Sequence, residues 1–167
     1  GAWGPAARAA NGFLRSPGLR DTPRAMSQEN VEAVERAVAA VNETYRTGDM
    51  RPWRRLVEAE CDPEIVLDAP TDAFTEGEWR GHDGAVGFVA NQMEVLDGMW
   101  LRVDEYIDVG DGDVIVVAIT FGGRARHSGL EVELHPVHVF RRRDGRTVRW
   151  QIFQAREEAL EAVGVRE

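Results

Sequence analysis

The chain has 167 residues, 43% of them hydrophobic and 29% charged, a composition typical of a globular protein with a buried core. Its formal net charge of -9 argues against a nucleic-acid partner, because phosphate backbones are bound by clustered Lys and Arg. No run approaches the roughly 20 apolar residues that span a bilayer, and the single Cys permits no internal disulfide, so we expect a cytoplasmic protein without membrane contact.

Residues 1–25 differ in composition from the rest of the chain. They are rich in Ala, Gly, Pro and Arg and show no sustained hydrophobic periodicity. They also lack the continuous apolar segment of a secretory signal. Because Met26-Ser27 looks like a natural start, we expect 1–25 to be a leader or extension and 26–167 to form a single domain.

Apolar residues then recur at spacings of three and four, the pattern of helices with one buried face. Ser27 is placed to cap the first helix, which ends at Gly48, and Asp49 is placed to cap a short second helix. A third helix is expected over about 82–96. The apolar stripes are Val31, Val34, Val38, Val41 and Tyr45 in the first helix, Trp53, Leu56 and Val57 in the second, and Val86, Val89, Met93 and Leu96 in the third.

The segment "EIVLDAP" (64–70) reads as a buried strand that ends in a carboxylate, Asp68. From Met99 onward the period changes to two, and tight turns at 110–112 and 144–145 separate the strands of a four-stranded antiparallel meander. A short helix closes the chain. No G-x-G-x-x-G or phosphate-binding loop sequence occurs, so we expect no nucleotide cofactor. This order predicts an α+β fold with helices on one face of a curved antiparallel sheet.

Five segments carry a resemblance to a known family: "TGDMRPWRRL", "EIVLDAP", "WRGHDGAVGFV", "VHVFRRRDGRTVRW" and "REEALEAVG". In this order they resemble the SnoaL-like branch of the nuclear transport factor 2-like (NTF2-like) superfamily. The resemblance implies a cone in which a curved antiparallel sheet wraps around three N-terminal helices, with a short C-terminal helix and a pocket at the open end. It also implies a homodimer formed through the outer sheet face. The superfamily hosts isomerases, cyclases, epoxide hydrolases and inactive binding domains, so the fold leaves the function open.

Ketosteroid isomerase looks like a distant relative, and its catalytic pattern identifies two candidate residues. Its general base lies in a V-x-D-P stretch, which "VLDAP" matches at Val66 and Asp68, with the Pro displaced to Pro70. The neutral aspartic acid of its oxyanion hole aligns with His138, and the tyrosine of that hole aligns with Val41. The resemblance therefore implies cofactor-independent chemistry in which Asp68 moves a proton and His138 stabilises or shuttles charge.

The other interpretations stay open. Asp68 could be the polar end of a strand and His138 a core residue, in a domain that binds a ligand without chemistry or serves dimerisation. Arg102 with Asp104, or Arg124, supplies the residue types of an epoxide-hydrolase-type site. His135 and His138 face opposite sides of one strand, so we expect no metal site.

We expect the pocket to bind a small, mostly apolar organic molecule that bears a carbonyl or hydroxyl group. Its predicted lining, besides Asp68 and His138, comes from the inward faces of the helices and strands and from the loop that follows "EIVLDAP". These residues are Val41, Tyr45, Val66, Trp79, Val89, Met93, Phe140, Trp150, Ile152 and Gln154.

Overall fold

The structure, a computed structural model, describes residues 26–70 and 76–165, so the leader expected at 1–25 lies outside the described part. Within these ranges four helices and one curved sheet form an α+β fold, which confirms the predicted fold class. The elements are α1 (Gln28–Thr47), α2 (Arg51–Glu60), β1 (Cys61–Ala69), β2 (Gly77–Arg80), α3 (Gly81–Val95), β3 (Leu96–Ile107), β4 (Val114–Ala125), β5 (Glu131–Leu134), β6 (Val137–Arg143), β7 (Arg146–Phe153) and α4 (Arg156–Ala162).

The strands form one curved, unclosed sheet in the order β2-β1-β7-β6-β4-β3, and β5 pairs with β4 beside β6. All neighbouring strands are antiparallel except β1 and β7, which run parallel. The sheet is therefore mixed, whereas the sequence pattern predicts antiparallel pairing. Local alternation cannot show this pair, because β1 and β7 are joined only through α3 and the whole meander.

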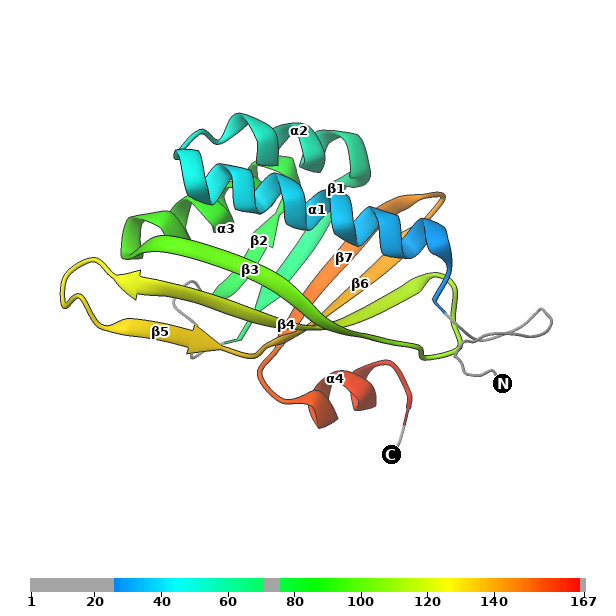
Figure 1. The fold of residues 1–167 in the computed structure, drawn as a ribbon. Helices are drawn as coiled ribbons and strands as arrows, with labels where there is room; N and C mark the ends of the chain where they lie inside the picture. Colours follow the sequence, from blue (N-terminus) through cyan, green and yellow to red (C-terminus); the bar gives the residue numbers. More distant parts are fainter. Residues whose placement is uncertain (1–25, 71–75, 166–167) are drawn as a thin grey trace.

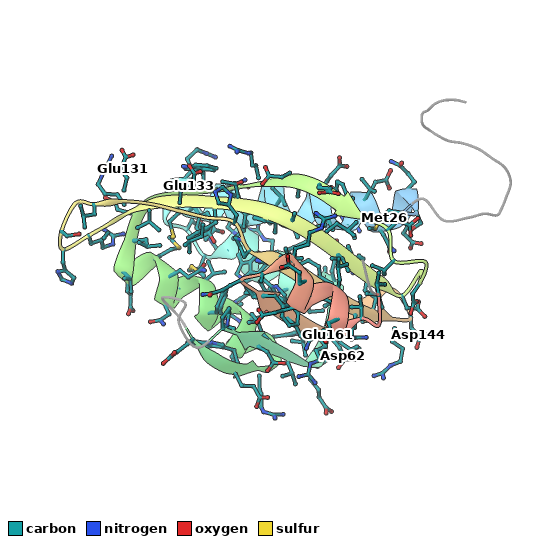
Figure 2. All side chains as sticks on the ribbon, turned by 90° about the horizontal axis from the view of Figure 1, so that it is seen from below. Met26, Asp62, Glu131, Glu133, Asp144 and Glu161 are labelled. Atoms are coloured by element: carbon teal, nitrogen blue, oxygen red, sulfur yellow. The ribbon has the colours of Figure 1, made fainter. Side chains whose placement is uncertain are left out.

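The helices cover both faces of the sheet unequally. Figure 1 shows α1, α2 and α3 on one face, with α4 alone on the opposite side. Figure 2, seen from below, shows α4 lying across that second face with Glu161 on it. Ala159 and Leu160 of α4 pack there against Val116 and Val139 of the sheet. None of the helices in the described residues is long and apolar enough to cross a membrane.

The predicted start and end of the first helix are confirmed. The Ser27 hydroxyl accepts a hydrogen bond from the Asn30 N–H at 3.1 Å, and Gly48 ends α1 in the left-handed conformation at φ 77°. The expected capping of α2 by Asp49 is wrong, because Met50 occupies the N-cap position. The Asp49 carboxylate instead accepts a hydrogen bond from the backbone N–H of Arg51, the first residue of α2, at 2.9 Å.

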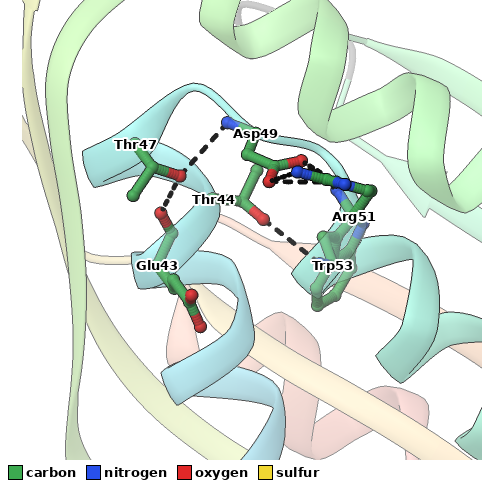
Figure 3. Close-up of polar contacts among 6 residues, drawn as sticks. All are labelled: Glu43, Thr44, Thr47, Asp49, Arg51 and Trp53. Carbon is green, nitrogen blue, oxygen red and sulfur yellow. Dashed lines mark hydrogen bonds and ion pairs between the residues drawn. The ribbon is translucent and has the colours of Figure 1, made fainter.

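A buried hydroxyl fixes α2 against the end of α1. The Thr44 side chain is fully buried, and its oxygen accepts the backbone N–H of Trp53 at 3.1 Å (Figure 3). Pro52 supplies no N–H in this first turn, so Thr44 satisfies a donor that the helix itself cannot. The bond positions Trp53, whose indole N–H donates to the Ala85 carbonyl of α3 at 3.1 Å.

Two features of the sheet differ from the sequence pattern. The loop expected at 71–81 contains β2, which pairs with β1. The segment "GLEVELHPVHVF" (129–140) alternates as one strand of the predicted meander would. In the structure it is divided at His135-Pro136 into β5 and β6, because Pro136 has no N–H to continue the ladder. The tight turn at Asp144-Gly145 is confirmed, with φ values of 54° and 77° that match the twist of a hairpin.

Candidate functional site

A cavity of about 390 Å³ lies between the three N-terminal helices and the inner face of the sheet. Its wall is mainly aliphatic and aromatic, and no Asp, Glu, Lys or Arg is among the described residues that form it. The lining comprises Val34, Ala37, Val38, Val41 and Tyr45 from α1; Trp53, Ala69 and Pro70; Phe88, Val89 and Gln92 from α3; and Leu101, Val117, Ile119, Phe121, Leu134, His135, Pro136, His138, Phe140, Trp150, Ile152 and Gln154 from the sheet and its loops.

Four aromatic rings meet at one part of this wall. The ring centroid of Trp150 lies 5.9 Å from that of Trp53, 5.7 Å from Phe88 and 5.5 Å from Phe140. Trp53 and Phe88 meet Trp150 edge to face, the arrangement that aromatic quadrupoles favour. The rings come from α2, α3, β6 and β7, so they join the helices to the sheet beside the cavity.

His138 is a buried polar side chain in this aromatic region. It is 6% exposed, and its Nδ1 accepts the indole N–H of Trp150 at 3.0 Å. Burial lowers the pKa of His138 to about 3, so the ring is neutral near pH 7. An indole can only donate, so Nδ1 carries no proton and the single ring proton lies on Nε2. His138 can therefore offer an N–H donor to a ligand while remaining uncharged.

A second polar pair lies on the helical side of the cavity. The Tyr45 hydroxyl of α1 donates to the amide oxygen of Gln92 of α3 at 3.0 Å. Burial raises the pKa of Tyr45, which keeps the phenol protonated. Because the amide oxygen of Gln92 accepts this bond, its NH₂ group presents two further donors.

The loop between β5 and β6 contributes His135 to the rim of the cavity. The Thr120 hydroxyl donates its only proton to the Asp104 carboxylate, so His135 Nδ1 must donate to the Thr120 oxygen at 3.1 Å. His135 Nε2 lies 3.3 Å from a carboxylate oxygen of Glu133, an exposed residue of β5 (Figure 2). These contacts tie the loop to β3 and β4.

The structure brings most of the predicted pocket residues together. Those that line the cavity come from α1, α3, β6, β7 and the segment after β7. They are Val41, Tyr45, Val89, His138, Phe140, Trp150, Ile152 and Gln154.

Val66 and Asp68 lie on the opposite face of the sheet from the cavity. Ile65 and Leu67 are fully buried against the helices, and successive strand residues alternate between faces. The Asp68 carboxylate is paired with the guanidinium of Arg149, the β7 residue that lies opposite Val66. The expectation that Val66 and Asp68 point into the cone has no support in this geometry. An uninterrupted apolar run such as Ile65-Val66-Leu67 does not reveal which alternate residues face inward.

Trp79 and Met93 pack beside the cavity without lining it. The Trp79 ring lies beside α3, where a Cβ on Gly87 would touch it, and its centroid is 6.0 Å from that of Phe88. Met93 packs in the apolar cluster around Leu96 and Phe121. Both side chains therefore support the wall from behind.

The residues of the epoxide-hydrolase alternative also lie away from the cavity. Arg102 pairs with Asp104 at 3.0 Å, and its guanidinium lies 5.4 Å from the ring centroid of Trp100. Arg124 lines a separate, smaller hollow near β5. Within residues 26–70 and 76–165, no three His, Cys, Asp or Glu side chains are grouped so that they could hold a metal ion.

Gln92 is the most informative residue that the sequence analysis missed. It lies three positions after Val89 on α3, so helical spacing alone places it on the cavity face. As a polar residue it does not belong to the apolar stripe of this helix, which continues from Val89 to Met93. Val117, Ile119 and Phe121 of β4 are likewise absent from the predicted lining, because in a continuously apolar strand the inward side has no distinguishing residue type. Phe88 and Leu101 are absent from it as well.

The fold is that of a cone-shaped α+β protein of the NTF2-like class: a curved mixed sheet, three helices that cover it and an apolar cavity between them. Residues 34–150 match the SnoaL-like domain family, and the chain belongs to that family.

Several solved structures share the fold. A putative SnoaL-like polyketide cyclase from Jannaschia sp. CCS1 is 18% identical to this chain, with a TM-score of 0.64. The match covers 87% of this chain and 99% of the cyclase. An NTF2-like protein of unknown function from Burkholderia pseudomallei is 24% identical, with 83% and 100% coverage and a TM-score of 0.61. TerC, crystallised with polyporic acid, is 26% identical, with 80% and 97% coverage and a TM-score of 0.59. No curated protein matches the chain.

Proposed function

We propose that this protein binds a small, mostly apolar organic molecule in the cavity between its helices and the sheet. The observation that carries the proposal is the combination of a cavity of about 390 Å³ with a wall that contains no charged Asp, Glu, Lys or Arg among its described residues. Burying an uncharged apolar molecule there removes apolar surface from water without stranding a charge. The few polar groups that face the ligand give it orientation.

The similarity to TerC, which was crystallised with polyporic acid, supports an organic ligand for this cavity. It does not identify the ligand, which we define by the chemistry of the wall. His138 supplies an uncharged hydrogen-bond donor within an aromatic surround. Such a donor stabilises negative charge that develops on a ligand oxygen.

A proton-transfer enzyme of the cyclase or isomerase type is the second candidate, and membership of the SnoaL-like family favours it. Such a reaction needs a base at the ligand. Asp68 lies on the other face of the sheet in an ion pair with Arg149, so the geometry does not favour it as that base. Nδ1 of His138 is occupied by Trp150, so His138 is suited to stabilising charge. Homodimerisation through the outer sheet face and a cytoplasmic location remain predictions.

Titration with N-phenyl-1-naphthylamine, a neutral apolar dye that fluoresces when it leaves water, tests the binding proposal. We expect saturable binding to the purified protein. Val41→Phe adds bulk inside the cavity and should weaken binding about tenfold or more, since a filled cavity cannot accept the dye without overpacking. Val66→Phe adds the same bulk on the outer face and is the matched control. Equal affinity of the two variants, or no saturable binding, would contradict the proposal.

A further inference from the structure

Two polar side chains of the cavity wall, His138 and Gln92, both present hydrogen-bond donors to a ligand, and this restricts the ligand's chemistry further. We propose that the cavity selects an uncharged apolar molecule that carries two separate hydrogen-bond acceptor oxygens, one for His138 and one for Gln92, and that it rejects cations. This inference rests on the proposed binding function and names the chemical class of the ligand.

The first donor is set by Trp150. Its indole N–H occupies Nδ1 of His138 at 3.0 Å, so the ring proton is confined to Nε2. Among the described residues no hydrogen-bond acceptor is found for Nε2, and Nε2 is not among the side-chain atoms that are sealed from solvent without a partner. His138 lines the cavity, so this N–H is available to a ligand. Trp150 therefore acts as a positioning residue that makes His138 a donor and prevents it from accepting.

Tyr45 orients the second donor, the side-chain amide of Gln92, in the same manner. Its hydroxyl proton is directed to the amide oxygen of Gln92 at 3.0 Å, which leaves the amide NH₂ of Gln92 as the outward group. Gln92 lines the cavity from α3, whereas His138 lines it from β6. The two donors thus belong to different walls, one helical and one in the sheet. A ligand that satisfies both must carry two acceptors at separate positions.

The wall also disfavours a cationic ligand. No carboxylate is present among the described lining residues. Two acidic side chains that contact lining residues or their neighbours, Asp104 and Glu133, are engaged with Thr120, Arg102 and His135. An ammonium group buried beside two N–H donors would be left without a counter-charge, which is unfavourable in an apolar medium. A carbonyl oxygen has no such cost, because it accepts what the wall donates.

A matched ligand series tests this selectivity. The probes share one naphthalene ring system: naphthalene itself, 2-acetylnaphthalene, a cationic (2-naphthylmethyl)ammonium, and the 2,6-, 2,7- and 1,5-diacetylnaphthalenes, which vary the separation of two carbonyls. Affinities are measured by displacement of N-phenyl-1-naphthylamine from the intact protein. Each satisfied acceptor should improve affinity about threefold to tenfold, so the best diacetyl compound should bind about 9-fold to 100-fold more tightly than naphthalene. The ammonium compound should bind more weakly than naphthalene.

Two variants assign the acceptors to their donors. Gln92→Leu and His138→Phe keep the approximate bulk of each side chain and remove its donor. In each variant we therefore compare the diacetyl compound with naphthalene bound to that same variant, and we expect the gain in affinity to be about threefold to tenfold smaller than in the unaltered protein. Gln151→Leu, on the outer sheet face, is the control. If His138→Phe does not fold, Trp150→Phe replaces it, because freeing Nδ1 removes the constraint on the ring proton.

The possible failures are distinguishable. If naphthalene displaces the dye but no carbonyl compound improves on it, or if the gain persists in both variants, the acceptor proposal is overturned while the binding function stands. If no probe displaces the dye because the dye itself does not bind, both proposals are overturned.

Discussion

The indole N–H of Trp150 donates to Nδ1 of His138 at 3.0 Å, across two neighbouring strands at the wall of the cavity. This bond joins two residues twelve positions apart and gives a neutral histidine one defined tautomer. Its consequences for the ring proton, for stability and for pH dependence can each be measured.

Trp150→Phe should allow the His138 proton to occupy either ring nitrogen, and it should destabilise the fold. The variant leaves a buried acceptor without its donor, which costs about 1–3 kcal/mol in addition to the lost indole volume. Nitrogen-15 NMR of the imidazole should show the Nε2–H form in the unaltered protein and a mixture of tautomers in the variant. Trp79→Phe is the control, since the buried indole nitrogen of Trp79 has no hydrogen-bond partner among the described residues. An unchanged tautomer in Trp150→Phe would show that Trp150 does not set it.

His138 should make the folded protein less stable in mild acid. Its pKa is about 3 in the folded state, against an ordinary value of 6.5 in an unfolded chain. Between these values the unfolded chain takes up a proton that the folded protein does not. Stability is therefore complete above pH 6.5 and falls by about 1.4 kcal/mol per pH unit as the pH drops toward 3.

Urea unfolding at pH 7 and pH 5 measures this effect. His138 should contribute a loss of about 2 kcal/mol between the two conditions, and His138→Phe should lack that contribution while retaining the effects of the carboxylates. An identical pH dependence in both proteins would refute the assignment to His138.

Thr44→Val should reduce the free energy of unfolding by about 1–3 kcal/mol, because the backbone N–H of Trp53 would then be buried without an acceptor. Thr47→Val is a matched control on the same helix, three residues later. Its hydroxyl donates to the Glu43 carbonyl and accepts from the Asp49 N–H (Figure 3), but it is exposed, so water can replace both bonds. We expect the control to change stability by no more than about 0.5 kcal/mol. Chemical denaturation of both variants gives the comparison, and similar losses would argue against the role of burial.

Asp68→Asn should leave dye affinity unchanged. Asp68 lies on the outer sheet face, half-buried in an ion pair with Arg149, and such partly exposed pairs contribute at most about 1 kcal/mol. Arg149→Gln, which removes the partner, should have an equally small effect on stability. The dye titration and urea unfolding test both statements. A large loss of affinity in Asp68→Asn would restore the hypothesis that this carboxylate acts at the ligand.

The sequence by itself determined the classes of element and three residues of the helical wall. Val41, Tyr45 and Val89 follow from a spacing of three and four, since a helix has one inward side and its apolar stripe marks that side. Trp150 and Ile152 follow from alternation on one strand, and the same alternation continues to Gln154 just beyond its end. The Asp144-Gly145 turn follows from residues that tolerate positive φ.

Only the tertiary structure decided which residues of β1 face inward and that β1 pairs in parallel with β7. It also decided that His138 and Gln92 present donors to the cavity. Ile65, Val66 and Leu67 are all apolar, so their sequence fits either orientation, and packing against the helices selects Ile65 and Leu67 for the core. That selection turns Asp68 outward to Arg149. The direction of the His138 and Gln92 donors depends on Trp150 and Tyr45, which reach them only after strands and helices distant in sequence are assembled.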